Sequence, residues 1–248
     1  MKKAISISCV LALIVLSGCT QAPEYATIQV GEKEGLIKNQ QEMVVKPIFK
    51  RVASLQGIEK NYQHPNYLNI HWFHDNGEKR YAVVENTSGK LGIIDTNGKM
   101  LVKPLFDSIS TRFNGYIKIE LNGKIGLLDE DFDVVLKPQF DKIDDFVYDT
   151  AVVEYKGKYG CIDRDMNLVL KPIYDHIYTL NEGIRRIELN DKWGFTNESC
   201  EVVVKPSFEY LEDFSNGIAK FQSNKLWGYI RPDGTILSKN IFTNGDSF

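Results

Sequence analysis

The feature that most constrains this chain is a pattern that recurs every 34 residues. A glycine recurs at Gly92, Gly126, Gly160, Gly194 and Gly228. A Lys-Pro pair recurs with the same step at Lys103-Pro104, Lys137-Pro138, Lys171-Pro172 and Lys205-Pro206. An earlier copy carries Gly35 and Lys46-Pro47, and in the last copy Asn240 follows Lys239 in place of proline. Six copies of one unit make this a repeat protein.

The residues within each copy predict β-structure. A 34-residue period also occurs in helical repeats, but here a proline follows the glycine by twelve positions in all copies except the last. Interior proline breaks helices. Runs such as 117–121 and 151–155 alternate and are rich in β-branched residues, and no window keeps helical apolar spacing. We therefore expect an all-β fold.

One copy, around Gly160, shows the expected unit. Its four predicted strands cover 151–155, 158–163, 168–170 and a short segment within 174–180. Short turns rich in Asn, Asp and Gly separate them, as is typical of β-hairpins. Pro172 is expected to end the third strand. An aromatic residue two positions after the proline would supply one core ring per unit. The mid-strand glycine would let a neighbouring backbone approach closely.

Six such hairpin or meander units can be arranged in two ways. We expect them to close into a propeller-like ring, and the alternative is an open β-solenoid. The repeat domain would cover residues 26–248, with an insertion at about 57–80 that lengthens the spacing between the first two copies.

Two copies carry a family resemblance. Lys-Trp-Gly-Phe at 192–195 and Leu-Trp-Gly-Tyr-Ile at 226–230 resemble the WG repeat, also called the KWG repeat. The match extends over residues 26–55 and 81–248. This resemblance implies a bacterial β-repeat protein that acts as a binding or scaffolding array. It also makes Trp193 and Trp227, which keep the tryptophan, candidate ligand contacts.

The N-terminus has the pattern of a lipoprotein signal. Lys2-Lys3 precedes an apolar run, and Leu16-Ser17-Gly18-Cys19 resembles the bacterial lipobox. This implies a signal peptide at 1–18, acylation of Cys19 and a short tether at 19–25. The bilayer would then be a partner through Cys19, and the protein would lie in the cell envelope, extracytoplasmic, at the outer membrane in a Gram-negative cell. The alternative is a secreted protein with a chance cysteine.

The remaining cysteines are not expected to pair. The chain has four cysteines, of which Cys9 would leave with the signal and Cys19 would carry lipid. Cys161 directly follows its repeat glycine, whereas Cys200 lies six positions after its own. Roughly 16 Å of strand separates those two levels, which is beyond the reach of a disulfide even if neighbouring repeats lie side by side. We therefore expect Cys161 to act as a small apolar residue.

The insertion is rich in aromatic residues and histidine. Tyr67, His71, Trp72 and His74 lie within it, and 67–73 alternates like a strand before a turn at 75–77. Loops that interrupt a repeat often bind ligands, so these four residues are ligand-binding candidates. The alternative, which we favour, is an extra hairpin that covers one end of the core. The histidine spacing matches no standard metal site, and no metal site is predicted.

No catalytic or cofactor motif is present. The chain lacks a nucleophile elbow, a zinc-protease helix and a phosphate-binding loop. Asp129, Asp131 and Asp133 resemble the start of a calcium loop, but Val134 and Phe140 occupy the positions that need Gly and Glu. A net charge of −3 and the absence of a basic block argue against nucleic acid. We expect neither an enzyme nor a cofactor.

The lysines of the Lys-Pro pairs share one position in every copy. They are Lys46, Lys103, Lys137, Lys171, Lys205 and Lys239. They could form an anion-collecting ring or guard strand edges against pairing. We favour the second role, because Asp107, Asp141, Asp175 and Glu209 follow four residues later and would cancel much of the field.

These observations leave two kinds of function. The first is a membrane-anchored extracytoplasmic module that binds a protein, peptide or glycan. The alternative is a structural scaffold of the cell envelope with no small ligand.

Overall fold

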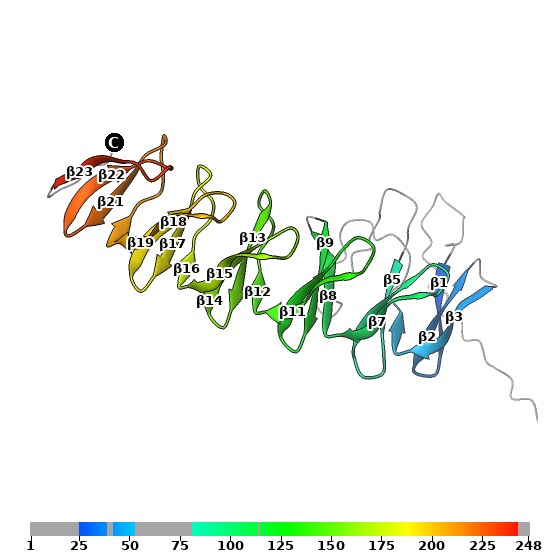
Figure 1. The fold of residues 1–248 in the computed structure, drawn as a ribbon. Coiled ribbons are helices and arrows are strands. Elements are labelled where there is room, and N and C mark those ends of the chain that lie inside the picture. Colours follow the sequence, from blue (N-terminus) through cyan, green and yellow to red (C-terminus); the bar gives the residue numbers. More distant parts are fainter. Residues whose placement is uncertain (1–24, 39–41, 53–80, 114, 243–248) are drawn as a thin grey trace, which may run out of the picture. The chain divides into compact units, whose positions relative to one another are not determined.

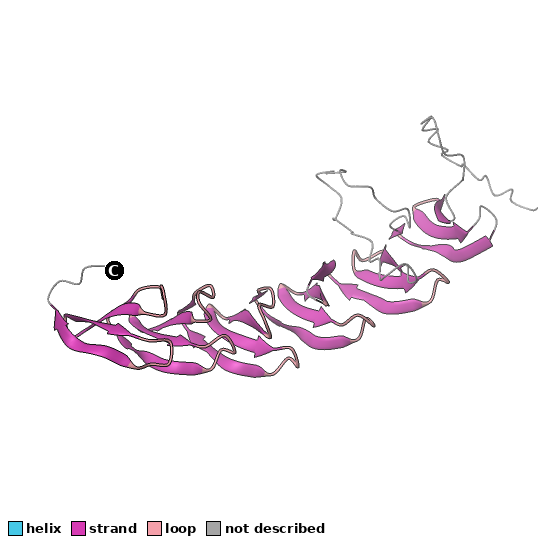
Figure 2. Ribbon diagram, turned by 90° about the horizontal axis from the view of Figure 1, so that it is seen from above, coloured by secondary structure: helices cyan, strands magenta, loops and turns pink. Residues whose placement is uncertain are grey.

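The computed structural model describes residues 25–38, 42–52, 81–113 and 115–242. All regular structure in these ranges is β-strand, as Figure 2 shows. No helix in the described part of the chain has the length and apolarity to span a membrane. The strands form small antiparallel sheets in tandem, each with two edge strands. The predicted all-β repeat fold is confirmed, and the choice between ring and open solenoid stays a prediction.

The chain divides into two compact units, of which the first comprises Met1–Asn122 and Leu127–Val134. Its first sheet contains β1 (Tyr25–Val30), β2 (Lys33–Lys38) and β3 (Glu42–Phe49). The second sheet contains β4 (Arg51–Val52), β5 (Tyr81–Glu85), β6 (Leu91–Asp95) and β7 (Met100–Phe106). The insertion predicted at 57–80 therefore separates β4 from β5, and residues 53–80 lie outside the described ranges.

The second unit comprises Gly123–Gly126 and Val135–Phe248. The division between the units runs through the third sheet, which contains β8 (Ser108–Phe113), β9 (Tyr116–Leu121), β10 (Lys124–Leu128) and β11 (Val134–Phe140). The fourth sheet contains β12 (Lys142–Ile143), β13 (Thr150–Tyr155), β14 (Lys158–Asp163) and β15 (Leu168–Tyr174).

Two further sheets complete this unit (Figure 1). The fifth contains β16 (His176–Ile177), β17 (Arg185–Leu189), β18 (Lys192–Thr196) and β19 (Val202–Phe208). The sixth contains β20 (Tyr210–Leu211), β21 (Ala219–Ser223), β22 (Leu226–Ile230) and β23 (Ile236–Phe242).

The short strand of each repeat belongs to a different sheet from the one expected. The segment after Tyr174 was predicted as the fourth strand of the unit around Gly160. Instead His176 and Ile177 pair with Glu188 and Ile187 and begin the next sheet. A strand of two residues has no local signal for its partner, so only tertiary packing decides which hairpin it joins.

The third strand continues through the Lys-Pro pair, which corrects the prediction that proline ends it. β15 runs from Leu168 to Tyr174, and its pairing with β14 shifts register on both sides of Cys161. Pro172 therefore lies in a bulge, where its missing N–H donor costs no ladder bond. The glycine opposite the bulge has the predicted role. A Cβ on Gly160 would lie 2.4 Å from the oxygen of Leu170 and 2.7 Å from the nitrogen of Pro172.

The hydrophobic core lies between consecutive sheets. In the second unit, one cluster joins Val152, Cys161 and Leu170 of the fourth sheet to Ile187 and Cys200 of the fifth. The predicted ring after each proline is buried wherever its burial is described, namely at Phe49, Phe106, Phe140, Tyr174 and Phe208. Each repeat therefore completes the core of its neighbour, which is how stacked repeats become stable.

In successive repeats, one aspartate contacts two neighbouring repeats through its two carboxylate oxygens. In the second unit, one carboxylate oxygen of Asp141 pairs with Lys124, and the other accepts a hydrogen bond of 2.7 Å from the backbone nitrogen of Lys156. The hydrogen bond from Lys124, followed by that from the Lys156 backbone, holds the pKa of the Asp141 carboxyl below its ordinary value. Asp107 and Asp175 make the same pair of contacts in their repeats.

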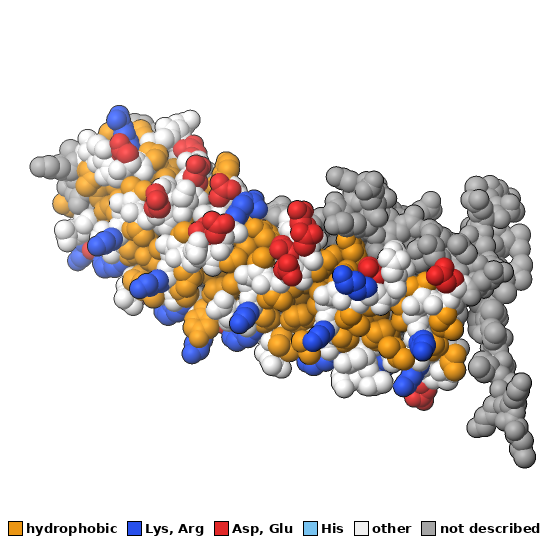
Figure 3. Space-filling view, turned by 45° about the vertical axis from the view of Figure 1, so that its right-hand side comes forward, with side chains coloured by type: hydrophobic (Ala, Val, Ile, Leu, Met, Phe, Trp, Pro, Cys, Tyr) orange, Lys and Arg blue, Asp and Glu red, His pale blue; other side chains and the backbone are white. Residues whose placement is uncertain are grey.

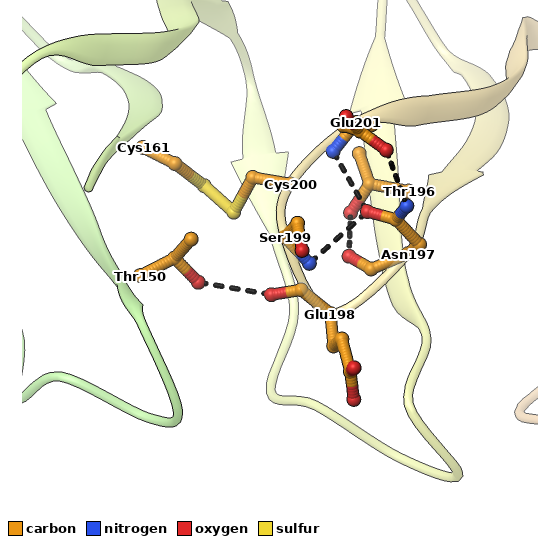
Figure 4. The surroundings of a disulfide bond; sticks show 8 residues. All are labelled: Thr150, Cys161, Thr196, Asn197, Glu198, Ser199, Cys200 and Glu201. Atoms are coloured by element: carbon orange, nitrogen blue, oxygen red, sulfur yellow. Dashed lines mark hydrogen bonds between the residues drawn. A yellow bond between two sulfur atoms is a disulfide. The ribbon is translucent and has the colours of Figure 1, made fainter.

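Cys161 and Cys200 form a disulfide, so the expectation that they stay unpaired is wrong (Figure 4). Their Cα atoms are 6.4 Å apart. The prediction assumed that the length of strand between the two levels keeps the cysteines apart. Instead the turn between β18 and β19 folds back onto the preceding sheet, where Thr150 donates a hydrogen bond of 3.0 Å to the carbonyl oxygen of Glu198. Cys200, with a positive φ of 61°, directs its side chain into this contact.

Candidate functional site

A row of aromatic side chains runs along the second unit. Tyr159, Trp193 and Trp227 directly precede the repeat glycines on β14, β18 and β22. His176 on β16 and Tyr210 on β20 lie midway between them in sequence, so that an aromatic ring recurs every 17 residues. Together with Tyr178, which follows β16, these residues form what we call the aromatic row.

The rings of the row contact one another in series. Ring centroids are 6.0 Å apart for Tyr159 and His176, and 6.0 Å apart for His176 and Tyr178. Tyr178 stacks on Trp193 at 5.1 Å with an interplanar angle of 27°. Tyr210 then bridges the two tryptophans, at 6.2 Å from Trp193 and 5.9 Å from Trp227, in edge-to-face geometry. These are the arrangements that aromatic quadrupoles favour.

Charged groups flank the rings as compensated pairs. The guanidinium of Arg186 lies 5.0 Å from the ring centroid of Tyr178 and 5.2 Å from that of Trp193. Its Nε atom is 2.8 Å from Oδ1 of Asp213. The Nζ atom of Lys220 lies 4.5 Å from the Trp227 ring and 3.8 Å from Oε1 of Glu212. The row therefore offers cationic donors and carboxylate acceptors beside apolar rings.

The hydroxyl of Tyr178 is a further polar group of the row. It donates a hydrogen bond of 3.2 Å to Oε2 of Glu188. Burial and then the negative charge of Glu188 raise the pKa of the Tyr178 phenol above its ordinary value. The hydrogen bond places the phenol beside the carboxylate of Glu188 at the margin of the row.

The row is a surface feature rather than an interior stack. Tyr210 is 41% exposed and His176 is exposed, while the other four rings are half-buried. Rings with one apolar face held by the protein and polar groups at their margin are suited to binding another molecule. Within the ranges that the structure covers, no group of three or more His, Cys, Asp or Glu side chains is placed to hold a metal ion.

The structure brings together two of the predicted site residues. Trp193 and Trp227 join one row through Tyr210. Tyr67, His71, Trp72 and His74, like the predicted lipidation site Cys19, lie outside the described residues and stay predictions.

Four members of the row were missed from sequence, namely Tyr159, His176, Tyr178 and Tyr210. The 17-residue step of aromatic residues was the signal that could have found most of them. In the preceding copies Leu91, Ser108, Ile125 and Lys142 occupy the same positions. The aromatic character is therefore confined to the C-terminal repeats.

Comparison with known proteins identifies the repeat. The family model described as "WG containing repeat" matches four consecutive segments, at residues 92–124, 125–159, 159–193 and 193–227. These segments together span more than half of the chain. No curated protein matches the sequence.

Some solved structures are weakly similar. Hsv2 from Kluyveromyces lactis shows 12% identity and a TM-score of 0.31, covering 64% of this chain and 59% of that one. The surface component PorZ of the type-IX secretion system of Porphyromonas gingivalis shows 10% identity and a TM-score of 0.28, covering 90% of this chain and 32% of PorZ. The chain thus spans about three fifths of the Hsv2 structure. At these TM-scores the likenesses support no inference.

Proposed function

The chain belongs to the family of proteins built from WG-containing repeats, and from that premise we propose that it is a membrane-anchored binding module of the cell envelope. The observation that carries this proposal is the aromatic row, because six contacting rings with flanking polar groups form a surface for a ligand rather than a reaction centre. Glycan chains are the ligand class that the row fits best.

The chemistry of the row favours a glycan over an ionic ligand. The faces of sugar rings present C–H bonds that pack against the negative face of an aromatic ring, and their hydroxyl groups need both donors and acceptors. Arg186 with Asp213, and Lys220 with Glu212, supply both at the margin of the rings. Because these charges are paired, the row has little net field to attract a polyanion.

Capture of polysaccharide tests the binding role. The chain from residue 20 onward is expected to sediment with insoluble peptidoglycan or chitin. Tyr210→Ala should weaken this binding about 5- to 30-fold, as for truncation of an interface aromatic, while Tyr148→Ala should leave it unchanged. Tyr148 is a matched control because it is 63% exposed and lies outside the row. Thermal melts of both variants check that the fold is kept.

Two outcomes would go against glycan binding. Equal loss in both tyrosine variants would mean that the row has no special role. Absence of polysaccharide binding, together with a stoichiometric envelope protein whose capture is insensitive to Tyr210→Ala, would favour the scaffold alternative.

The anchoring part of the proposal rests on the lipobox-like Leu16-Ser17-Gly18-Cys19 segment. The disulfide between Cys161 and Cys200 is consistent with this location, because disulfides persist in oxidising compartments outside the cytoplasm. Two or more acyl chains on one cysteine give stable membrane attachment.

Cys19→Ala tests the anchor. The wild-type protein is expected in the detergent phase after phase separation, whereas the variant should stay uncleaved or become soluble. Cys9→Ala is the control, since Cys9 lies within the signal and should not affect partitioning. A Cys19→Ala variant that still partitions with membrane lipid as wild type does would rule out the lipobox interpretation.

A further inference from the structure

Two sets of repeat lysines differ in their partners. Lys90, Lys124 and Lys158, which lie two residues before a repeat glycine, form ion pairs with Asp107, Asp141 and Asp175. These are the aspartates that the sequence suggested would neutralise the Lys-Pro lysines. They are already paired elsewhere, and each also accepts a backbone hydrogen bond. In these three repeats the aspartates therefore form their ion pairs with lysines other than the Lys-Pro lysines.

The Lys-Pro lysines keep their positive charge at the surface. Lys46 and Lys103 in the first unit, and Lys137, Lys171 and Lys205 in the second, are all exposed. They lie on β3, β7, β11, β15 and β19, each of which is an edge strand of its sheet. Among the residues that the structure describes, none of these five lysines has a hydrogen bond or an ion pair with an acidic side chain.

Large apolar side chains are exposed on the same edge strands. On β15, Leu168 is 51% and Ile173 is 49% exposed, on either side of Lys171. In the second unit the exposed apolar residues of β11, β15 and β19 are Val135, Leu168, Val169, Ile173 and Val202, and β23, which is also an edge strand, adds Ile236 and Leu237. In the first unit they are Met43, Ile48, Met100, Leu105 and Val134. Figure 3 shows such hydrophobic side chains in orange at the surface, with single blue Lys or Arg side chains spaced among them.

We propose that the edge strands β11, β15, β19 and β23 of the second unit, with the unpaired lysines of the first three and the exposed apolar residues of all four, form a face that contacts an anionic lipid bilayer; we call it the Lys-Pro face. An edge strand usually carries charge without large apolar groups, and a solvated lysine row would need no apolar neighbours. At a bilayer surface the two kinds of side chain have separate roles. The ammonium groups meet lipid phosphates, while the apolar groups enter the boundary between headgroups and acyl chains.

The position of the predicted anchor favours a bilayer over other anionic partners. This part of the argument rests on the anchoring proposed above. β1 begins at Tyr25, six positions after Cys19, so an extended tether reaches at most about 20 Å. Such a short tether holds the domain at the membrane, where weak surface contacts gain from a high effective concentration. A soluble polyanion would use the lysines but leave the apolar residues in water.

Vesicle sedimentation of the unlipidated chain, from residue 20 onward, tests the proposal without the anchor. We expect binding to vesicles of phosphatidylcholine with phosphatidylglycerol and little binding to phosphatidylcholine alone. The variant Lys137→Gln/Lys171→Gln/Lys205→Gln should lose on the order of 100-fold in partitioning, because each lysine near an anionic surface contributes about fivefold.

A matched control has the same change of charge. The variant Lys156→Gln/Lys192→Gln/Lys225→Gln alters three exposed lysines at hairpin tips, outside the Lys-Pro face, and should bind nearly as wild type does. A second variant, Leu168→Ser/Ile236→Ser, keeps the charge and should weaken binding to anionic vesicles through the apolar residues alone. Circular dichroism of all variants checks that the β-fold is retained.

Several results would overturn the proposal. Equal losses in the two lysine triples would mean that only net charge matters. Binding to heparin without binding to anionic vesicles would replace the lipid surface by a soluble polyanion, and binding to neither would leave the lysines as guards of the strand edges. Because polysaccharide capture depends on Tyr210 and uses no lipid, failure of this proposal is distinguishable from failure of glycan binding.

Discussion

Gly194→Ala is expected to destabilise the repeat domain by about 3 kcal/mol or more, towards or beyond the upper end of overpacking costs. A Cβ at this position would lie 2.3 Å from the carbonyl oxygen of Val204, 2.7 Å from the nitrogen of Pro206 and 2.8 Å from the carbonyl carbon of Lys205. All three atoms are backbone, so no side chain can rotate away. Relief requires the bulge in β19 to move, which would disrupt its pairing with β18. Urea denaturation followed by circular dichroism measures the loss.

Gly157→Ala provides the control for this prediction. Gly157 lies in a tight turn with a φ of 74°, and a Cβ there would meet no atom within 4 Å. Only the cost of a left-handed conformation remains, about 1 kcal/mol. If the two alanine variants lose the same free energy of unfolding, the close backbone approach at Gly194 does not account for the predicted loss.

The repeat and its β-character were predictable because both depend on local chemistry. Proline at a fixed distance from glycine excludes helices, and alternating runs such as 117–121 specify strands. Lys156 and Gly157 both have positive φ, 53° and 74°, as expected of the tight hairpin turn predicted there. The core ring after each proline also follows from position alone, as the burial of Phe140 and Phe208 confirms.

Features that depend on neighbouring repeats were not predictable in the same way. His176 and Ile177 pair with β17 rather than with their own repeat, and no local signal marks that choice. Pro172 was expected to end a strand, but a bulge accommodates it because Gly160 leaves room opposite. In both cases the backbone of a second strand decides the outcome.

The candidate site was predictable only in part. The family resemblance directed attention to Trp193 and Trp227, whereas the row also uses Tyr210 and His176 from the short strands. Those residues become neighbours of the tryptophans because each short strand begins a new sheet. Because the short strand was assigned to the wrong sheet, the aromatic residues that the short strands contribute to the row were missed from sequence.

Loss of the disulfide between Cys161 and Cys200 is expected to lower the free energy of unfolding of the fifth and neighbouring repeats by about 2–4 kcal/mol. The bond joins residues 39 apart in sequence, so its reduction frees a long loop in the unfolded chain. It also joins the fourth sheet to the turn of the fifth, where both sulfur-bearing side chains are fully buried. Since each repeat is stabilised mainly by its neighbours, the loss should appear as earlier melting of the C-terminal repeats.

Comparing the chain from residue 20 onward with and without reductant measures this loss. The oxidised chain should show no free thiol and the reduced, unfolded chain two, from Cys161 and Cys200. The variant Cys161→Ser/Cys200→Ser is the control, because its stability should match that of the reduced protein and should not respond to reductant. Free thiols in the protein as isolated from the cell envelope would contradict the disulfide. Unchanged stability on reduction would mean that the packing of the turn against β14, rather than the covalent bond, holds these two repeats together.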